Sequence, residues 1–137
     1  MSDSRTATLV LVEDDDVDAE RVIRAAQRAG APFAIRRASD GVEALALLRR
    51  EIPRPCIVLL DLKMPRMGGL QFLGELRGDD ALRRTVVFVM TTSLDEEDRR
   101  AAYDKLVAGY IPKHQTGGDF GPVIQMLRHY IEVVELS

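Results

Sequence analysis

The sequence lacks the features that mark several classes of protein. It contains a single cysteine, Cys56, so no internal disulfide is possible, and the apolar run that it begins predicts a buried, inert thiol. It has no basic excess: the formal net charge is -3, which argues against nucleic acid and an anionic membrane as partners. No apolar stretch is long enough to cross a bilayer, and residues 1–5 have no apolar signal core, so we expect a cytoplasmic protein.

What is present is the composition of an ordinary globular domain. Apolar residues make up 46% and charged residues 30% of the 137 positions, a balance typical of soluble domains that bury a core. This length suits one domain and leaves little room for a second. We therefore expect residues 1–137 to form a single domain, with its core from about residue 7 to residue 135.

Short apolar runs alternate with longer amphipathic segments five times along the chain. The runs at residues 8–12, 56–60 and 86–90 are nearly continuous in apolar residues, as in central strands of a parallel sheet with helices on both faces. Shorter runs at residues 33–35 and 109–111 complete the set of five predicted strands.

Helical patterns lie between these runs. They cover residues 16–29, 41–51 and 69–77, a segment that opens with residues 95–97 behind a Ser93 cap, and a last segment over about 119–135. The alternation predicts an α/β fold, a three-layer sandwich. The leading topology is a flavodoxin-like five-stranded parallel sheet of order 2-1-3-4-5 with five helices, whose functional site lies at the carboxyl ends of the strands.

Acidic residues follow two of the predicted central strands. Glu13, Asp14, Asp15 and Asp16 follow the first strand, and Asp61 follows the third, so a parallel sheet brings their carboxylates to one edge. Crowded carboxylates raise one another's pKa unless a cation neutralises them, and Mg²⁺ needs only one or two carboxylates. Asp15 and Asp16 could instead cap the first helix. We favour the capping role for Asp16, and metal chemistry for Asp14 with Asp61.

Two other strand ends supply further parts of a phosphoryl site. The fourth strand finishes at Thr91-Thr92-Ser93, which places hydroxyl groups beside the predicted pocket. The fifth strand is followed by Lys113, a point charge suited to phosphate oxygens. A nucleophile, metal ligands, a hydroxyl and an ammonium group thus gather from four strands.

These motifs resemble the receiver domain of bacterial response regulators, over about residues 7–130. The resemblance is carried by the segment Leu9–Asp14, by Asp61-Leu62-Lys63-Met64-Pro65 with Gly68-Gly69, by Thr91 and by Lys113. It implies a two-component signalling protein that accepts a phosphoryl group from a sensor histidine kinase.

The resemblance also assigns the acceptor and the metal ligands. It implies that Asp61 is the phosphoryl acceptor and that Asp14, with Glu13 more distantly, holds Mg²⁺ together with the backbone carbonyl of Lys63. Glu13 stands where the family usually has aspartate, and its extra methylene still allows a water-mediated contact with the metal.

The same resemblance implies a switch. Thr91 would bond one phosphoryl oxygen and Lys113 another, while Tyr110 resembles the aromatic residue that swings inward as the threonine moves. Asp61 would attack a phosphohistidine, and hydrolysis of the acyl phosphate would reset the site. Enzyme-like activity is thus expected only on the protein itself.

A narrower resemblance concerns the partner. The triplet Thr91-Thr92-Ser93, His114 in place of a proline, and the lack of an output domain are similar to regulators that partner bacterial phytochrome kinases. Chemotaxis-type and relay regulators remain the alternatives.

The last predicted helix is more apolar than a covering helix needs to be. One stripe, from Phe120 to Val134, suffices for the core. A second stripe beside it suggests a homodimer interface and consists of Val123, Met126, Tyr130 and Val133. The alternative is a monomer in which the loop after Lys113 covers this stripe.

Two rival functions fit the sequence less well than phosphoryl transfer. A haloacid-dehalogenase-type phosphohydrolase wants a second aspartate two positions after its nucleophile, where this chain has Lys63. A phosphorylation-independent binding module tends to lose the acceptor or the metal ligands, and this chain keeps Asp14, Asp61, Thr91 and Lys113. We therefore predict a response regulator rather than either rival.

Overall fold

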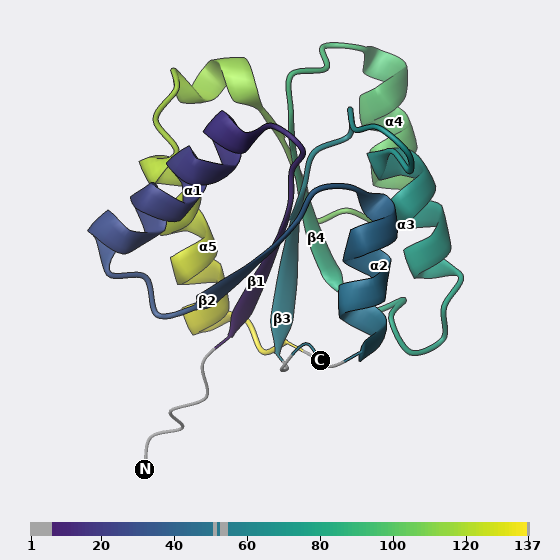
Figure 1. The fold of residues 1–137 in the computed structure, drawn as a ribbon, viewed down its shortest axis with the longest axis horizontal. Helices are drawn as coiled ribbons and strands as arrows, with labels where there is room; N and C mark the ends of the chain where they lie inside the picture. The colour runs from purple at the N-terminus through teal and green to yellow at the C-terminus, as the bar shows by residue number, and fades with distance from the viewer. Residues whose placement is uncertain (1–6, 51, 53–54, 137) are drawn as a thin grey trace.

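The computed structural model describes residues 7–50, 52 and 55–136, and within them five parallel strands form one sheet (Figure 1). Their order is β2-β1-β3-β4-β5, as predicted. The strands are β1 (Thr8–Val12), β2 (Ala34–Ala38), β3 (Cys56–Leu60), β4 (Val86–Thr91) and β5 (Gly109–Pro112). Since all five run the same way, their carboxyl ends lie together, at the top of Figure 1.

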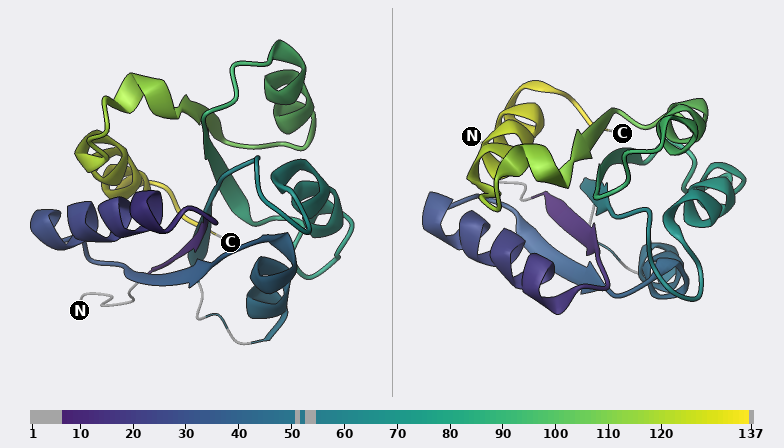
Figure 2. Two further views of the ribbon diagram at one scale, coloured as in Figure 1. Left: turned by 45° about the horizontal axis from the view of Figure 1, so that its top comes forward. Right: turned by 90° about the horizontal axis from the view of Figure 1, so that it is seen from above.

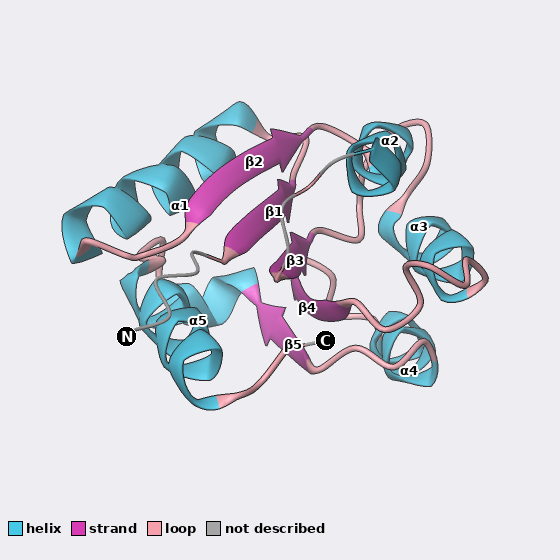
Figure 3. Cartoon of the chain, turned by 90° about the horizontal axis from the view of Figure 1, so that it is seen from below, coloured by secondary structure: helices cyan, strands magenta, loops and turns pink. Residues whose placement is uncertain are grey.

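Five helices cover the two faces of the sheet. They are α1 (Asp16–Ala29), α2 (Gly41–Arg50), α3 (Gly69–Arg77), α4 (Glu96–Asp104) and α5 (Gly121–Val133). The helices α1 and α5 pack together on one face, while α2, α3 and α4 follow one another along the other face (Figure 2). The predicted three-layer sandwich is confirmed, and its layers are seen along the sheet in Figure 3.

The central strands explain the continuous apolar runs. Along β1, Leu9 and Leu11 belong to the core cluster under α1 and α5, whereas Val10 and Val12 belong to the cluster under α2, α3 and α4. Alternate side chains of a strand point to opposite faces, so a strand buried on both faces needs apolar residues at every position. All five residues of β1 and of β3 are buried.

The second strand begins and ends later than the sequence predicted. Its predicted core was residues 33–35, but β2 runs from Ala34 to Ala38 and pairs with the whole of β1. The reason is that β2 lies at the edge of the sheet, where Arg36 and Arg37 are tolerated because they interrupt no core. A search for an apolar run therefore stops too early.

Two helix ends also differ from the prediction. The cap of α4 is Asp95, whose carboxylate accepts a hydrogen bond from the Glu97 N–H at 2.9 Å, and not Ser93. The α5 helix begins at Gly121 rather than near residue 119 and ends at Val133, after which the backbone is extended. Among the described residues, no helix has the length and apolarity that a membrane crossing requires.

The last helix exposes less apolar surface than the predicted second stripe. Val123 is buried in the core, so its assignment to a dimer interface is wrong: the helix is rotated so that this residue faces α1 and the sheet. Met126 and Tyr130 are half-buried against the same cluster, and the Tyr130 ring packs edge-on against Phe88 with centroids 5.2 Å apart. Val133 is 81% exposed.

Candidate functional site

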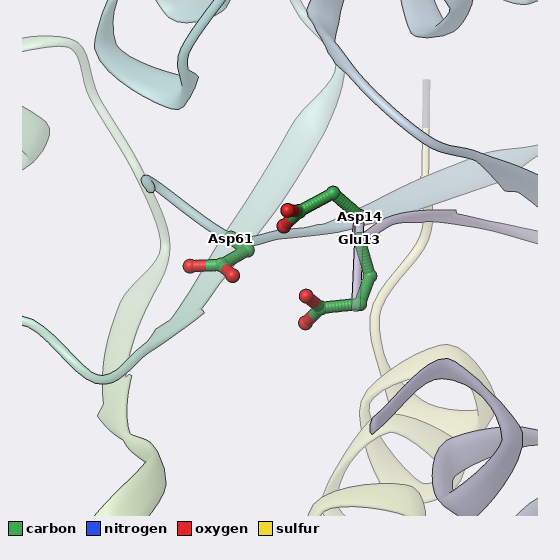
Figure 4. A group of neighbouring side chains, drawn as sticks. All are labelled: Glu13, Asp14 and Asp61. Carbon is green, nitrogen blue, oxygen red and sulfur yellow. The ribbon is translucent and has the colours of Figure 1, made fainter. Parts of the chain in front are cut away.

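The ends of β1 and β3 bring three carboxylates together. These strands are neighbours in register, with Val12 opposite Leu60, so the residues that follow them lie side by side. Oxygen atoms of Glu13, Asp14 and Asp61 all lie within 4.8 Å of one another (Figure 4). Carboxylate oxygens are the ligands that hard divalent cations prefer, and this spacing is close to what one ion would need.

Burial makes this cluster unfavourable without a counter-charge. Glu13 and Asp61 are buried, and Asp14 lies exposed at the mouth of the group. Burial raises the pKa of Glu13 to about 7. The negative charge of Asp61 also raises this pKa, whereas the neighbouring Lys113 lowers it. A bound divalent cation would remove this penalty, because it favours the ionised form of every carboxylate around it.

Lys113 provides the only ammonium group that the described residues bring into this cluster. Its side chain is 9% exposed and its Nζ lies 2.8 Å from Glu13 Oε1, 2.7 Å from Asp18 Oδ2 and 3.4 Å from Asp61 Oδ2. Burial alone would lower the pKa of Lys113, but the hydrogen bonds to Asp18 and Glu13 outweigh it and hold the pKa above its usual range. The lysine therefore stays charged beside Asp61.

The end of β4 supplies the predicted hydroxyl group. Thr91 is fully buried and its Oγ1 accepts a hydrogen bond from the Ser93 N–H at 3.2 Å. The Ser93 hydroxyl in turn donates to Asp98 of α4 at 2.7 Å. A change at Thr91 therefore reaches the start of α4 through two hydrogen bonds.

The loop after β3 lies directly against the cluster. The Lys63 N–H donates to Asp61 Oδ1 at 3.2 Å, and the Lys63 ammonium pairs with Asp98 at 3.0 Å. Gly69 is required for close approach, since a Cβ there would lie 2.6 Å from Leu62 Cα and 2.7 Å from the Asp61 carbonyl oxygen. This contact explains the second glycine of the pair in the sequence motif.

Comparison with known proteins identifies this arrangement. The family profile described as response regulator receiver domain matches residues 9–122. The chain belongs to the response regulator receiver family. Receiver domains are signalling proteins that histidine kinases phosphorylate, not enzymes that act on other substrates, and they bind Mg²⁺ or Mn²⁺ at an acidic pocket.

Individual relatives extend over almost the whole chain. The probable methanogenesis regulatory protein FilR2 of Methanothrix harundinacea is 34% identical over 89% of this chain and 81% of its own length. The response regulator Rcp1 of Synechocystis is 31% identical over 93% of this chain and 91% of its own length.

Solved structures agree with the family assignment. The phosphorylated cyanobacterial phytochrome response regulator RcpA is 30% identical and has a TM-score of 0.85. The match covers 96% of this chain and 98% of RcpA. The Mn²⁺-bound form of Rcp1 is 29% identical and has a TM-score of 0.79. The match covers 95% of this chain and 98% of Rcp1.

In this receiver domain the predicted switch tyrosine lies inward. The Tyr110 ring packs against the core and beside Tyr103, with ring centroids 6.5 Å apart. Its hydroxyl is buried and makes no hydrogen bond of normal geometry with any residue that the structure describes. Burial raises the pKa of Tyr110, and the nearby Ser93 opposes that rise.

One of the acids that follow β1 has a role that differs from the prediction. Asp15, not Asp16, caps α1, since its carboxylate accepts a hydrogen bond from the Asp18 N–H at 3.0 Å. Asp16 is the first helical residue and points outward to Arg37 at 2.9 Å. Nothing in the sequence singles out Asp18, because an acid in the first turn of a helix is already explained by the helix dipole. Its contact with Lys113 becomes visible only in the folded structure.

Proposed function

We propose that this receiver domain accepts a phosphoryl group on Asp61, with Mg²⁺ held by Asp14, Asp61, Glu13 and the backbone carbonyl of Lys63. The observation that carries the proposal is the buried Lys113 ammonium, 3.4 Å from Asp61 Oδ2. Together with the adjacent carboxylates, of which Asp14 is exposed, it forms a site that combines a fixed positive charge with ligands for one cation. Bound Mg²⁺ would neutralise charge on the phosphoryl oxygens and supply no covalent step.

The transfer itself requires little covalent chemistry from the protein. An Asp61 carboxylate oxygen attacks the phosphorus of a phosphohistidine; the new P–O bond forms as the P–N bond breaks, and the imidazole leaves. Positioning and cationic stabilisation of the transferring group supply the catalysis. Hydrolysis of the resulting acyl phosphate at the same site returns the protein to its resting state.

Phosphorylation would act on the rest of the domain through Thr91 and Tyr110. Thr91 would donate its hydroxyl hydrogen to a phosphoryl oxygen, while its oxygen can still accept from the Ser93 N–H, so the two bonds would link the phosphoryl group to the segment before α4. Tyr110, which already lies inward against the core, would be held in that position. Such a local charge event biases a two-state element.

We further propose a bacterial phytochrome kinase as the phosphoryl donor. The support is the likeness to Rcp1 and to RcpA, a phytochrome response regulator, each over more than nine-tenths of this chain. A cytoplasmic location and a single domain over residues 1–137 go with this proposal. A homodimer through the exposed part of α5, around Met126, Tyr130 and Val133, is the proposed assembly.

The experiment that tests the acceptor is intact mass after incubation with acetyl phosphate, with and without Mg²⁺. We expect wild type to gain the mass of one phosphoryl group only with Mg²⁺, and Asp61→Asn to gain none. Asp79→Asn is the matched control, because Asp79 pairs with Arg49 away from the site and undergoes the same chemical change. It should be phosphorylated like wild type.

Two results would contradict the proposal. If neither acetyl phosphate nor the partner kinase phosphorylates wild type, the protein is a phosphorylation-independent binding module with a receiver fold. If Asp61→Asn is still phosphorylated on an aspartate in the presence of Mg²⁺, the acceptor is another residue of the cluster.

A further inference from the structure

The shortest bond of the Lys113 ammonium goes to a residue that is neither the acceptor nor a proposed metal ligand. Nζ lies 2.7 Å from Asp18 Oδ2 and 2.8 Å from Glu13 Oε1, but 3.4 Å from Asp61 Oδ2. An ammonium group has three N–H donors, so the three carboxylates can each receive one. The two shorter bonds, to Asp18 and Glu13, leave the third donor for Asp61.

The first turn of α1 fixes the Asp18 carboxylate in this position. Asp15 caps the helix and accepts a hydrogen bond from the Asp18 N–H at 3.0 Å, so the backbone of this residue is anchored. Side chains of a helix lean toward its N-terminus, and the N-terminus of α1 lies next to the end of β1. The Asp18 carboxylate therefore reaches back toward Glu13 and Lys113 without leaving the helix.

Lys113 needs such an anchor because of where β5 lies. The strand order places β5 at the edge of the sheet, separated from β1 by β3 and β4. Lys113 opens the 3₁₀ helix Lys113–Thr116, and its side chain must extend back across the strand ends to the acidic cluster. A four-carbon chain with an ammonium group has many rotamers, and bonds at its far end favour one of them.

We propose that Asp18 is the positioning residue that holds Lys113 beside Asp61 before the phosphoryl donor arrives. This inference rests on the proposed function, since it concerns the lysine of the same site. The Asp18 carboxylate makes no hydrogen bond to the acceptor or to the proposed metal ligands. It is linked to them only through the Lys113 ammonium that they share. Its effect on phosphoryl transfer therefore passes through Lys113. Because the ammonium is already in place, no conformational entropy has to be lost to position it during the reaction.

Removing the charge of Asp18 separates positioning from metal binding. In Asp18→Asn the amide keeps the shape of the side chain but weakens its bond to the ammonium, because charge-assisted hydrogen bonds are roughly twice as strong as neutral ones. We expect the rate of phosphorylation by acetyl phosphate at saturating Mg²⁺ to fall about tenfold, as when a partner that orients a site residue is removed. The Mg²⁺ affinity, measured by titration calorimetry, should change less than about twofold.

The matched control is Glu20→Gln. It also replaces a carboxylate of α1 by an amide, and Glu20 pairs with Arg24 on the exposed side of the helix instead of with Lys113. Its phosphorylation rate should equal that of wild type. Asp18→Glu, which restores the charge, should recover part of the lost rate.

A double-mutant comparison tests whether Asp18 acts through the lysine. Lys113→Ala should be slow, and adding Asp18→Asn to it should change the rate less than about twofold, since no ammonium remains to be positioned. Thermal unfolding of each variant shows whether it is folded at the assay temperature. Asp18→Ser, a second uncharged side chain that suits the first turn of a helix, replaces Asp18→Asn if the latter is unfolded.

The outcomes are distinct from those of the proposed function. If wild type is phosphorylated and Asp18→Asn is as fast, Asp18 does not position the lysine. The same conclusion follows if the rate and the Mg²⁺ affinity fall together, or if the two changes are additive in the double variant. If wild type is not phosphorylated by any donor, it is the proposed function that fails.

Discussion

At the scale of single residues, the Tyr110 hydroxyl is the least satisfied polar group in the described part of the chain. It is buried without a hydrogen-bond partner of normal geometry, although the ring packs well against the core. A buried polar group without a partner reduces the free energy of unfolding, because it loses its bonds to water on folding. In the resting domain the inward position of the tyrosine is therefore maintained mainly by ring packing.

Replacing this tyrosine tests that account. We expect Tyr110→Phe to raise the free energy of unfolding by about 1 kcal/mol, since it removes the unsatisfied hydroxyl and keeps the ring. Urea unfolding at neutral pH measures the change. The control is Tyr103→Phe, whose hydroxyl belongs to an exposed neighbour and whose removal should be close to neutral. A loss of stability in Tyr110→Phe would mean that the hydroxyl has a partner in solution.

The residues of the site could be predicted to different degrees. Glu13, Asp14, Asp61 and Lys113 each follow a strand end, and a parallel sheet brings strand ends together whatever the details of packing. Asp18 lies inside a helix, and its contact with the lysine depends on how α1 sits against the end of β5. No periodic pattern in the sequence carries that information.

At the scale of elements, one ion pair joins the start of α2 to the loop between β3 and α3. Asp40 caps α2 through the Glu43 N–H at 2.9 Å, and its other oxygen accepts a hydrogen bond from Arg66 Nε at 2.6 Å. Arg66 has a φ of 59°, in the left-handed region that few side chains favour. The Gly41 N–H donates to the Met67 carbonyl at 3.0 Å and completes the link.

This link predicts a pH dependence of stability. The hydrogen bond from Arg66 holds the pKa of Asp40 below its usual value of 3.8. Since the folded-state pKa is lowered, the contribution to stability is present above about pH 4 and is lost as the pH falls through the folded-state value. We expect Asp40→Asn, which can still cap the helix, to lower the free energy of unfolding by about 1 kcal/mol at pH 7, a modest value because Arg66 is exposed.

Urea unfolding at several pH values checks this expectation. The difference between Asp40→Asn and wild type should shrink as the pH falls below about 4. Arg66→Gln, which removes the other partner, should show the same pH dependence. A difference that stays constant with pH would indicate that the variant damages the cap rather than the ion pair.

The strands that are buried on both faces of the sheet could be predicted best from the sequence. The central strands β1, β3 and β4 were predicted close to their observed bounds, because burial on both faces makes them nearly continuous in apolar residues. The edge strand β2 was misplaced, since its core is one-sided and two arginines interrupt the run. Helix ends depend on which of several polar residues makes the capping bond, as Asp95 does rather than Ser93.

At the scale of the whole molecule, an apolar surface borders the core cluster under α1 and α5. It is formed by α5 and the β5 edge of the sheet, where Ile111, Met126, Tyr130 and Ile131 are only partly buried and Val133 is 81% exposed. The sequence predicted an apolar excess on the last helix but assigned Val123 to the outside. Which stripe is covered depends on the rotation of α5 against α1, and the composition of the helix does not determine that rotation.

The proposed homodimer through this surface makes the last prediction. We expect wild type to sediment as a dimer at micromolar concentration and Val133→Glu to weaken the dimer at least tenfold, since a charge within an apolar contact must be desolvated. Val42→Glu is the matched control, because Val42 is an exposed valine of α2 on the opposite face of the sheet. It should leave the dimer unchanged. A wild type that sediments as a monomer, both with and without phosphorylation, would exclude the dimer, whereas a dimeric Val133→Glu would move the interface away from α5.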